Sequence, residues 1–224
     1  MTASAMRTPK PYKGTPMEGP LASWYASNTK GGLDEFKALA GRIAARLPPG
    51  AAVLEVAPGP GYLAVEMARL GLKVSSLDIS RAFVRIGEAK AAQARVSVDV
   101  RLGDAAAQPF ADSRFDFIVC RAAFKNFGDP VGALGEMHRV LRPGGTALII
   151  DMRGDASNAS IRDAVNTMKL GPASAWITDR ILRSLRRRAY SRDAFARMIA
   201  DTPFGEGRIG TDAIGFEIEL TRRV

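Results

Sequence analysis

Apolar residues follow two different periods along the middle of the chain. Between residues 51 and 152, short apolar runs typical of strands are separated by stretches whose apolar positions recur every three or four residues, as in helices. The runs expected to form strands are "AAVLEVA", "KVSSLDI", "VSVDVRLGD", "FDFIVCRA" and "TALIIDM". Strands separated by helices indicate a mainly parallel sheet that is covered on both faces. The expected fold class is therefore α/β, with a doubly wound sheet.

The segments between these strands, and those that flank them, have the apolar spacing of helices. Helices are expected over residues 21–28, 34–47, 62–70, 81–94, 129–141 and 191–199. The start of the helix over 129–141 is marked clearly, because Asp129 can cap it and Pro130 stands at its first position. Pro48-Pro49-Gly50 ends the helix over 34–47, just before the first strand.

Both ends of the chain depart from this alternation. Residues 1–20 are rich in Pro, Gly, Ser, Thr and Lys, and we expect a flexible or loosely docked arm ahead of a single domain over 21–224. After Met152 the pattern breaks, and residues 153–189 are expected to form an irregular and helical insertion. The closing segment "RIGTDAIGFEIELTRR" predicts two strands around Gly215, arranged as a hairpin.

Composition excludes several classes of protein. Hydrophobic residues make up 46% of the chain and charged residues 25%, the profile of an ordinary globular domain. The single cysteine, Cys120, rules out an internal disulfide and a cysteine-rich zinc site, and no metal site is expected. The chain lacks an apolar run long enough to span a membrane and an N-terminal signal peptide, so a cytoplasmic protein is expected by default.

The formal net charge of +9 is the unusual global feature. Such a charge is compatible with a nucleic acid or an anionic membrane surface as partner. The basic residues are scattered, apart from "RSLRRR" at 183–188, and this distribution favours a basic surface without a nucleic-acid partner.

A glycine-containing loop follows the first predicted strand. "GPGYLA", residues 59–64, fits the pattern G-x-G-x-x-[GA], in which Gly59 and Gly61 let the backbone approach a ligand closely. Glu55, inside the strand before this loop, would repel a pyrophosphate and attract an ammonium group, through water or the loop backbone. The pair of features favours a ligand with an amino group over a dinucleotide.

Two more carboxylates follow the next two strands. Asp78 can accept hydrogen bonds from both hydroxyls of a ribose, since the alternative role of helix N-cap suits Ser80 better. Asp104 can accept from the exocyclic amine of an adenine while the Ala105 N–H donates to a ring nitrogen, unless "GD" is an ordinary turn. These positions indicate an adenosine-type ligand.

Five segments together, in this order, resemble the class I S-adenosylmethionine-dependent methyltransferases, most of all the bacterial group that acts on small molecules. They are "VLEVAPGPG", "SLDIS", "GDAAAQPF", "FDFIVCRAAFKNFGDP" and "RVLRPGGTALIID". The resemblance covers residues 21–223 and is dense over 51–152. Ala57-Pro58 stands where many members have Gly-Cys, which changes the loop packing but keeps the glycines. The resemblance implies a Rossmann-like methyltransferase fold with a seven-stranded sheet, an antiparallel last strand, and S-adenosyl-L-methionine as cofactor.

The predicted site follows from these strand ends and from the resemblance. The cofactor-binding candidates are Tyr25, Glu55, Ala57, Pro58, Gly59, Gly61, Asp78, Ile79, Asp104, Ala105 and Arg121. The insertion over 153–189 is expected to form an acceptor lid. Its apolar stripe is expected to be core, the alternative being a basic amphipathic helix that touches a membrane or an anionic acceptor. The stripe comprises Trp176, Ile177, Ile181, Leu182 and Leu185.

Methyl transfer needs proximity, alignment and exclusion of water, and a general base only when the acceptor is protonated. No catalytic residue is identified, but the candidates are Tyr25, Lys125, Asn126 and Asp151. Trp24 and Tyr25 either close an aromatic lid or simply pack. His138, the only histidine, is expected at the end of the sheet opposite the ligand.

The function predicted from the sequence is methyl transfer to a small-molecule acceptor by a monomer or homodimer. An RNA methyltransferase, a dinucleotide oxidoreductase and a non-catalytic S-adenosylmethionine-binding protein are the alternatives. "CRAAFKN" lacks the Asn-Pro-Pro-Tyr arrangement of adenine amino-group methylation. Nucleic acid is therefore not the expected partner, whereas peripheral membrane contact stays open.

Overall fold

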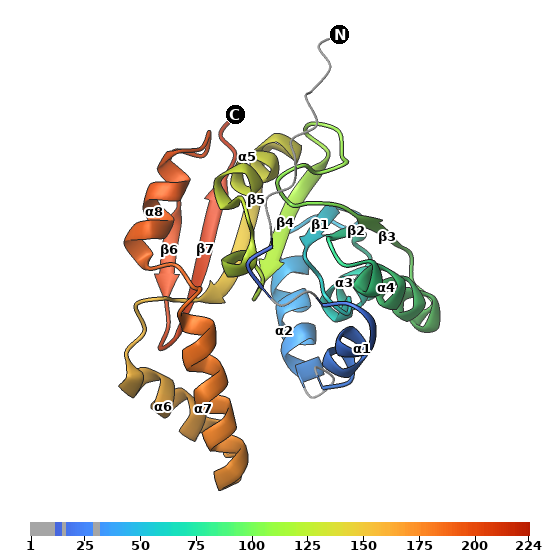
Figure 1. The fold of residues 1–224 in the computed structure, drawn as a ribbon. Helices are drawn as coiled ribbons and strands as arrows, with labels where there is room; N and C mark the ends of the chain where they lie inside the picture. The colour runs from blue at the N-terminus through green and yellow to red at the C-terminus, as the bar shows by residue number, and fades with distance from the viewer. Residues whose placement is uncertain (1–11, 15–16, 29–31) are drawn as a thin grey trace.

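The computed structural model describes residues 12–14, 17–28 and 32–224 (Figure 1). The rest of the predicted arm, residues 1–11 and 15–16, lies outside the described residues.

The described residues form a seven-stranded sheet with the strand order β3-β2-β1-β4-β5-β7-β6 (Figure 1). The strands are β1 Ala52–Val56, β2 Lys73–Asp78, β3 Val98–Leu102, β4 Phe115–Arg121, β5 Leu141–Met152, β6 Arg208–Thr211 and β7 Gly215–Thr221. Strands β1 to β5 are parallel, and β7 is antiparallel to both β5 and β6. The mainly parallel sheet and the antiparallel closing hairpin confirm the predicted fold class.

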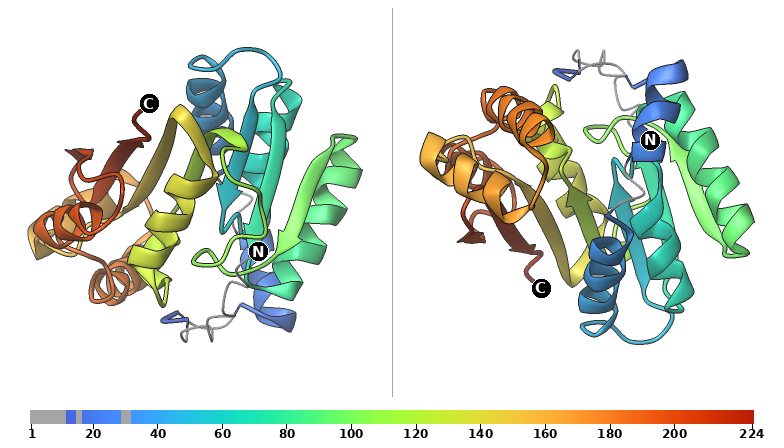
Figure 2. Two further views of the ribbon diagram at one scale, coloured as in Figure 1. Left: turned by 90° about the horizontal axis from the view of Figure 1, so that it is seen from above. Right: turned by 90° about the horizontal axis from the view of Figure 1, so that it is seen from below.

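Helices cover both faces of this sheet (Figure 2). They are α1 Gly19–Asn28, α2 Leu33–Ala44, α3 Tyr62–Arg69, α4 Arg81–Ala94, α5 Pro130–Val140, α6 Asn158–Thr167, α7 Pro172–Arg186 and α8 Arg192–Ala200, with a 3₁₀ turn, η2, at Phe124–Asn126. Helices α2 and α3 pack on one face, against side chains such as Val53. Helices α5 and α8 pack on the other, against its neighbour Leu54. Successive strand residues point to opposite faces, so an uninterrupted apolar strand has two buried faces.

Local capping explains where two of the helices begin. The Ser80 hydroxyl accepts a hydrogen bond from the Phe83 N–H at 3.1 Å and caps α4. The Asp129 carboxylate accepts from the Gly132 N–H at 3.1 Å, and Pro130 takes the first position of α5. Both starts lie where the sequence predicts them, because a cap depends on residues within one turn.

The segment "RPGG", residues 142–145, lies within β5, although the predicted strand "TALIIDM" begins only after it. Strand β5 begins at Leu141, and the β4–β5 register shifts between Phe115 and Phe117. Gly144, with a φ of +80°, donates its N–H to the Arg222 carbonyl at 2.7 Å. The backbone therefore keeps pairing through the irregularity, which is why β5 begins five residues before the predicted strand "TALIIDM".

The prediction that the apolar stripe of α7 is core is wrong. Trp176 is 66% exposed, Ile177 51% and Ile181 52%, while Leu182 and Leu185 are half-buried and no residue of α7 is fully buried. The reason is that α7 packs on α6, and the two helices project beyond the strand ends (Figure 1). No helix among the described residues is both long and apolar enough to cross a bilayer.

Candidate active site

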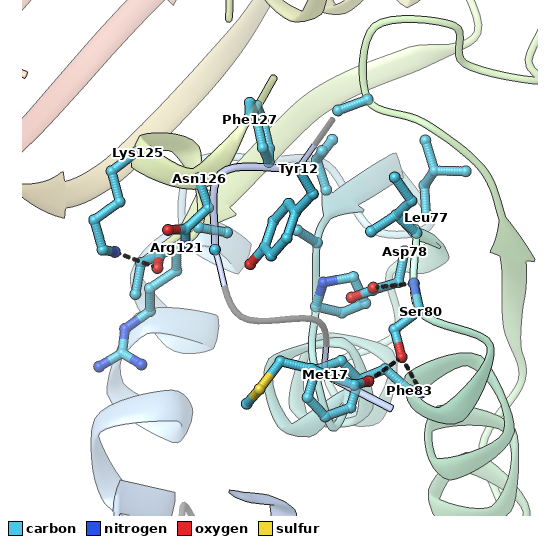
Figure 3. A pocket seen from close by; sticks show the side chains of 18 of the residues that line it. Tyr12, Met17, Leu77, Asp78, Ser80, Phe83, Arg121, Lys125, Asn126 and Phe127 are labelled. Carbon is cyan, nitrogen blue, oxygen red and sulfur yellow. Dashed lines mark hydrogen bonds between the residues drawn. The ribbon is translucent and has the colours of Figure 1, made fainter. Parts of the chain in front are cut away.

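A cavity of about 530 Å³ lies at the carboxyl ends of the parallel strands, where Figure 3 shows side chains from β2, the loop after β4 and the N-terminal segment facing one another. Of the eleven predicted cofactor-binding residues, nine line it, and Gly59 and Gly61 do not. Of the catalytic candidates, Tyr25, Lys125 and Asn126 line it, whereas Asp151 does not. In an open α/β sheet this end is where ligands bind.

The loop between β1 and α3 is a tight turn built on positive φ angles. Ala57, Gly59 and Gly61 have φ values of +57°, +55° and +78°. A Cβ on Gly61 would lie 3.3 Å from the Gly87 Cα, so this glycine lets α3 begin close to α4. The Gly59 N–H donates to the Asp78 carboxylate at 3.1 Å. The two glycines thus shape the turn and join it to β2, while Ala57 and Pro58 face the cavity.

Glu55 is a buried carboxyl with an unsatisfied atom. It is 4% exposed, lines the cavity, and its Oε2 has no hydrogen-bond partner among the described residues. Burial raises its pKa from 4.5 to about 8, and the neighbouring Asp78 adds to the rise, while Arg121 opposes it. A cationic group that binds beside Glu55 would favour the ionised form and pair with it.

Asp78 ends β2 as a second buried acid. Its Oδ1 accepts from the Ser80 N–H at 2.9 Å and its Oδ2 from the Gly59 N–H at 3.1 Å. Burial raises its pKa to about 6, and these two N–H donors limit the rise. A carboxylate has about four acceptor positions, so about two remain for hydroxyl groups of a ligand.

Asp104 and Ala105 line the cavity beside β3. The Asp104 Oδ1 accepts from the Ala106 N–H at 2.9 Å, and its carbonyl accepts from the Ala107 N–H at 3.0 Å. The Oδ1 atom is therefore engaged in an ordinary turn, as the alternative interpretation has it. The other carboxylate oxygen, Oδ2, is the atom that could accept from the amine of an adenine. Ile79, 48% exposed, adds an apolar wall.

Lys125 and Asp151 form a buried ion pair of 2.7 Å. The ammonium of Lys125 contacts Oδ1 of Asp151, and this oxygen also accepts from the backbone N–H of Met152 at 2.7 Å. Oδ2 accepts from the backbone N–H of Lys125 at 2.9 Å. These bonds fix the loop after β4 to the end of β5, so Asp151 is turned away from the cavity. Asn126, next in this loop, lines the cavity with a buried Oδ1 that has no partner among the described residues.

Two other predicted residues approach the cavity, Tyr25 from α1 and Arg121 from the end of β4. Tyr25 lines it and meets Phe83 edge to face at 5.9 Å between ring centroids, whereas Trp24 is 64% exposed and lies outside the lining. Arg121 pairs with Glu35 at 2.8 Å. Of the proposed aromatic lid, only Tyr25 faces the cavity.

Sequence reasoning missed the contribution of the N-terminal segment. Tyr12, Met17 and Glu18 line the cavity, and Figure 3 shows Tyr12 near its centre. The Glu18 carboxylate accepts from the N–H groups of Arg81 and Ala82 at 2.9 and 3.2 Å. These contacts join positions 63 and 64 residues apart, and no local pattern in the sequence signals them.

The backbone beside Tyr12 is fixed by contacts of the next residue. Lys13 donates its N–H to the Asn126 carbonyl at 3.0 Å and its ammonium to the Tyr190 hydroxyl at 2.8 Å. Burial raises the pKa of the Tyr12 phenol, and Asp78 adds to the rise, so Tyr12 is a neutral hydrogen-bond donor at physiological pH.

His138 lies away from this cavity, as expected. Its ring meets Phe204 edge to face at 4.9 Å, and its carbonyl accepts from Arg222 at 3.2 Å. Burial, with a smaller contribution from Arg222, lowers its pKa. These partners lie where α5 enters β5, at the amino end of the strand.

Comparison with known proteins points in the same direction. Residues 54–149 match the family model described as a methyltransferase domain. The chain is 38% identical over 103 residues to a demethylmenaquinone methyltransferase from Renibacterium salmoninarum, and this match covers 46% of this chain and 42% of the relative. It is 34% identical over 112 residues to a ubiquinone biosynthesis O-methyltransferase from Xanthomonas campestris pv. campestris, and this match covers 48% of this chain and 46% of the relative. The matches span less than half the length of these relatives.

The fold extends this likeness beyond the matched segment. The crystal structure of a candidate S-adenosyl-L-methionine-dependent methyltransferase from Methanococcus maripaludis superposes with a TM-score of 0.75 at 20% identity, over 94% of this chain and 96% of that one. At this identity the likeness concerns the fold alone. Residues 54–149, which contain the turn after β1 and the acids at the ends of β1 and β2, are thus the part of the chain that is similar to a methyltransferase domain.

Proposed function

We propose that this protein transfers the methyl group of S-adenosylmethionine to a small-molecule acceptor. The observation that carries the proposal is Glu55, a buried carboxyl whose Oε2 lacks a partner among the described residues and which lines the cavity beside the turn after β1. A buried, unsatisfied acid is costly unless a ligand completes it. The ammonium of the cofactor's methionine end has the charge and the donors to do so, whereas the pyrophosphate of a dinucleotide has neither.

The other predicted residues fit the remaining parts of this cofactor. Asp78 has acceptor positions left for the two ribose hydroxyls, and Asp104 with Ala105 stands one strand further along for the adenine. The cofactor, when bound, supplies a methyl group that its positive sulfur activates. The walls that would flank it are Tyr25, Ala57, Pro58, Ile79 and Arg121, and Gly59 and Gly61 serve through the shape of the turn.

The protein's own residues contribute orientation and exclusion of water. Tyr12 offers a neutral hydroxyl donor, and Asn126 offers the unpaired acceptor Oδ1, so the two together can orient a polar group of the acceptor. Lys125 and Asp151 are engaged with each other, which leaves neither as a free general base. We therefore propose catalysis by proximity and alignment, without a dedicated base.

The acceptor side supports a small, largely apolar molecule. Met17, Phe127 and Leu185 line the cavity near Tyr12, and Arg188 adds one cation. The named relatives act in the methylation of demethylmenaquinone and in ubiquinone biosynthesis, and both names denote small-molecule chemistry. We propose an acceptor of this class.

Calorimetry with S-adenosylhomocysteine and with NAD tests the cofactor assignment. We expect S-adenosylhomocysteine to bind and NAD to fail, and Glu55→Gln to bind S-adenosylhomocysteine more weakly than the matched surface variant Glu88→Gln on α4. Tight NAD binding would instead support an oxidoreductase. Methyl incorporation from labelled S-adenosylmethionine over a panel of quinol-like and phenolic acceptors then tests catalysis, since binding without any transfer would indicate a non-catalytic protein.

A further inference from the structure

The helical hairpin of residues 158–188, formed by α6 and α7, projects beyond the strand ends (Figure 1). It exposes an apolar tip, consisting of Met168, Leu170, Trp176, Ile177 and Ile181, which are 41 to 66% exposed. Five of the twelve exposed large hydrophobic residues of the described chain thus lie within fourteen positions. Single exposed apolar residues need no explanation, but a contiguous group on a projecting element marks a contact surface.

The hairpin is also the most basic part of the chain. It has seven basic residues and two acidic ones, a difference of +5 out of the chain's +9. The basic residues are Arg162, Lys169, Arg180, Arg183, Arg186, Arg187 and Arg188. One of the acids, Asp179, is paired with Arg183.

Along α7 the apolar residues begin nearer the tip and most of the cations lie nearer the body, while Ile181 follows Arg180 and Lys169 lies at the tip itself. Trp176 and Ile177 lie in the first half of the helix, near the tip, and Arg187 follows its last residue, near the body. Arg180 lies between them, with its guanidinium 5.8 Å from the centroid of the Trp176 ring. A helix with apolar residues toward one end and cations behind them matches the depth profile of a bilayer, with acyl chains below and anionic headgroups above.

We propose that this hairpin docks the protein on an anionic lipid bilayer, with the apolar tip in the boundary between headgroups and acyl chains. Two other partners fit this surface less well. A second copy of the hairpin is disfavoured because its like charge of +5 would repel the first, and a nucleic acid is disfavoured because it would leave Ile177 and Ile181 in water. A bilayer accommodates the indole, the aliphatic side chains and the arginines together. The docking concerns only the hairpin surface, so it holds or fails independently of methyl transfer.

Docking would also bring the cavity to the lipid surface. Leu185 and Arg188, at the base of the hairpin, line the cavity. An acceptor dissolved in the membrane would therefore meet the protein beside the cavity wall, and would not need to cross the aqueous phase first.

Tryptophan fluorescence of the full chain tests the proposal, because the protein has two tryptophans. In a Trp24→Phe background, Trp176 is the sole reporter. We expect its emission to shift to shorter wavelength, and to be quenched by brominated acyl chains, with vesicles of phosphatidylcholine containing about one-quarter phosphatidylglycerol at about 0.15 M salt. Binding to vesicles of phosphatidylcholine alone should be weaker by at least about tenfold.

Co-sedimentation of variants with the same vesicles separates the two contributions. Trp176→Ala with Ile177→Ala should lower partition at least about tenfold. Arg180→Gln with Arg187→Gln should lower it by about fivefold for each charge. The matched controls are Leu70→Ala, 51% exposed after α3, and Arg85→Gln, exposed on α4, and both should bind like the parent.

Three results would overturn the proposal. They are the absence of binding to the anionic vesicles, an equal loss in the control variants, and a stable dimer in sedimentation that Trp176→Ala dissociates. The exposed positions make loss of folding by these variants unexpected, and circular dichroism checks it. If the tip variant failed to fold, the arginine variant would still test the electrostatic contribution.

Discussion

Replacing Glu55 by glutamine should stabilise the ligand-free protein and weaken its affinity for S-adenosylhomocysteine. The folded protein holds the Glu55 proton up to about pH 8, whereas an exposed glutamate loses it near pH 4.5. Between these values the folded state binds more protons than the unfolded state, so the free energy of unfolding decreases as the pH rises. Glutamine has no such proton, and the variant lacks this decrease.

The magnitude follows from the same two pKa values. At 1.36 kcal/mol per pH unit, the difference between 4.5 and about 8 amounts to about 5 kcal/mol above pH 8. At pH 7 it amounts to about 3 kcal/mol, and at pH 5 to less than about 1 kcal/mol. The ligand-bound protein should respond in the opposite direction, because loss of a charge-assisted hydrogen bond costs about 1.5–3 kcal/mol of binding free energy.

Urea unfolding at pH 5 and pH 7, followed by circular dichroism, measures the stability. Glu88→Gln, which removes an exposed carboxylate from α4, is the control and should show no comparable dependence on pH. The reasoning is refuted if Glu55→Gln is no more stable than the parent at pH 7, or if its advantage is as large at pH 5 as at pH 7.

Three further predictions concern other residues of the site and its surroundings. Asp78→Ala should weaken S-adenosylhomocysteine binding by about 2–3 kcal/mol in calorimetry, and unchanged affinity would contradict the ribose assignment. His138→Gln should keep methyl transfer within a few-fold of the parent, because the ring packs on Phe204 away from the cavity; a hundredfold loss in an initial-rate assay would contradict this placement. Lys125→Met should lower the free energy of unfolding by about 3–5 kcal/mol, because it leaves the Asp151 carboxylate buried without its partner, and adding Asp151→Leu should restore part of the loss in urea titrations. Additive losses would show that the two residues do not act as a pair.

The sequence predicts those features that depend on residues close together in the chain. The caps at Ser80 and Asp129 lie within one turn of the helices that they begin, and α4 has the predicted bounds. The acids Glu55 and Asp78 could be placed at one edge of the sheet, because parallel strands bring their carboxyl ends together. Periodicity therefore predicts the mainly parallel sheet, whereas the cofactor side of the cavity follows from the strand ends together with the family resemblance.

The features that the sequence does not predict depend on contacts between distant segments of the chain. Nothing in the local pattern shows that Glu18 caps α4 or that Tyr12 enters the cavity, since these contacts join segments more than sixty residues apart. The sequence offers Asp151 as a catalytic candidate, and only the structure shows it paired with Lys125. The apolar stripe of α7 has the spacing of a core helix, but burial depends on what else packs there, and the outward face carries no partner within the described chain.

Calorimetric titration of the protein with S-adenosylhomocysteine at pH 7, in two buffers of different ionisation enthalpy, tests the central claim most directly. Because the pKa of Glu55 is about 8, the ligand-free carboxyl holds its proton at this pH. Pairing with the ligand's ammonium should release about one proton per bound molecule, and Glu55→Gln should abolish that release. Binding that releases no proton, or a release that persists in Glu55→Gln, would contradict the claim that Glu55 holds the amino end of the cofactor.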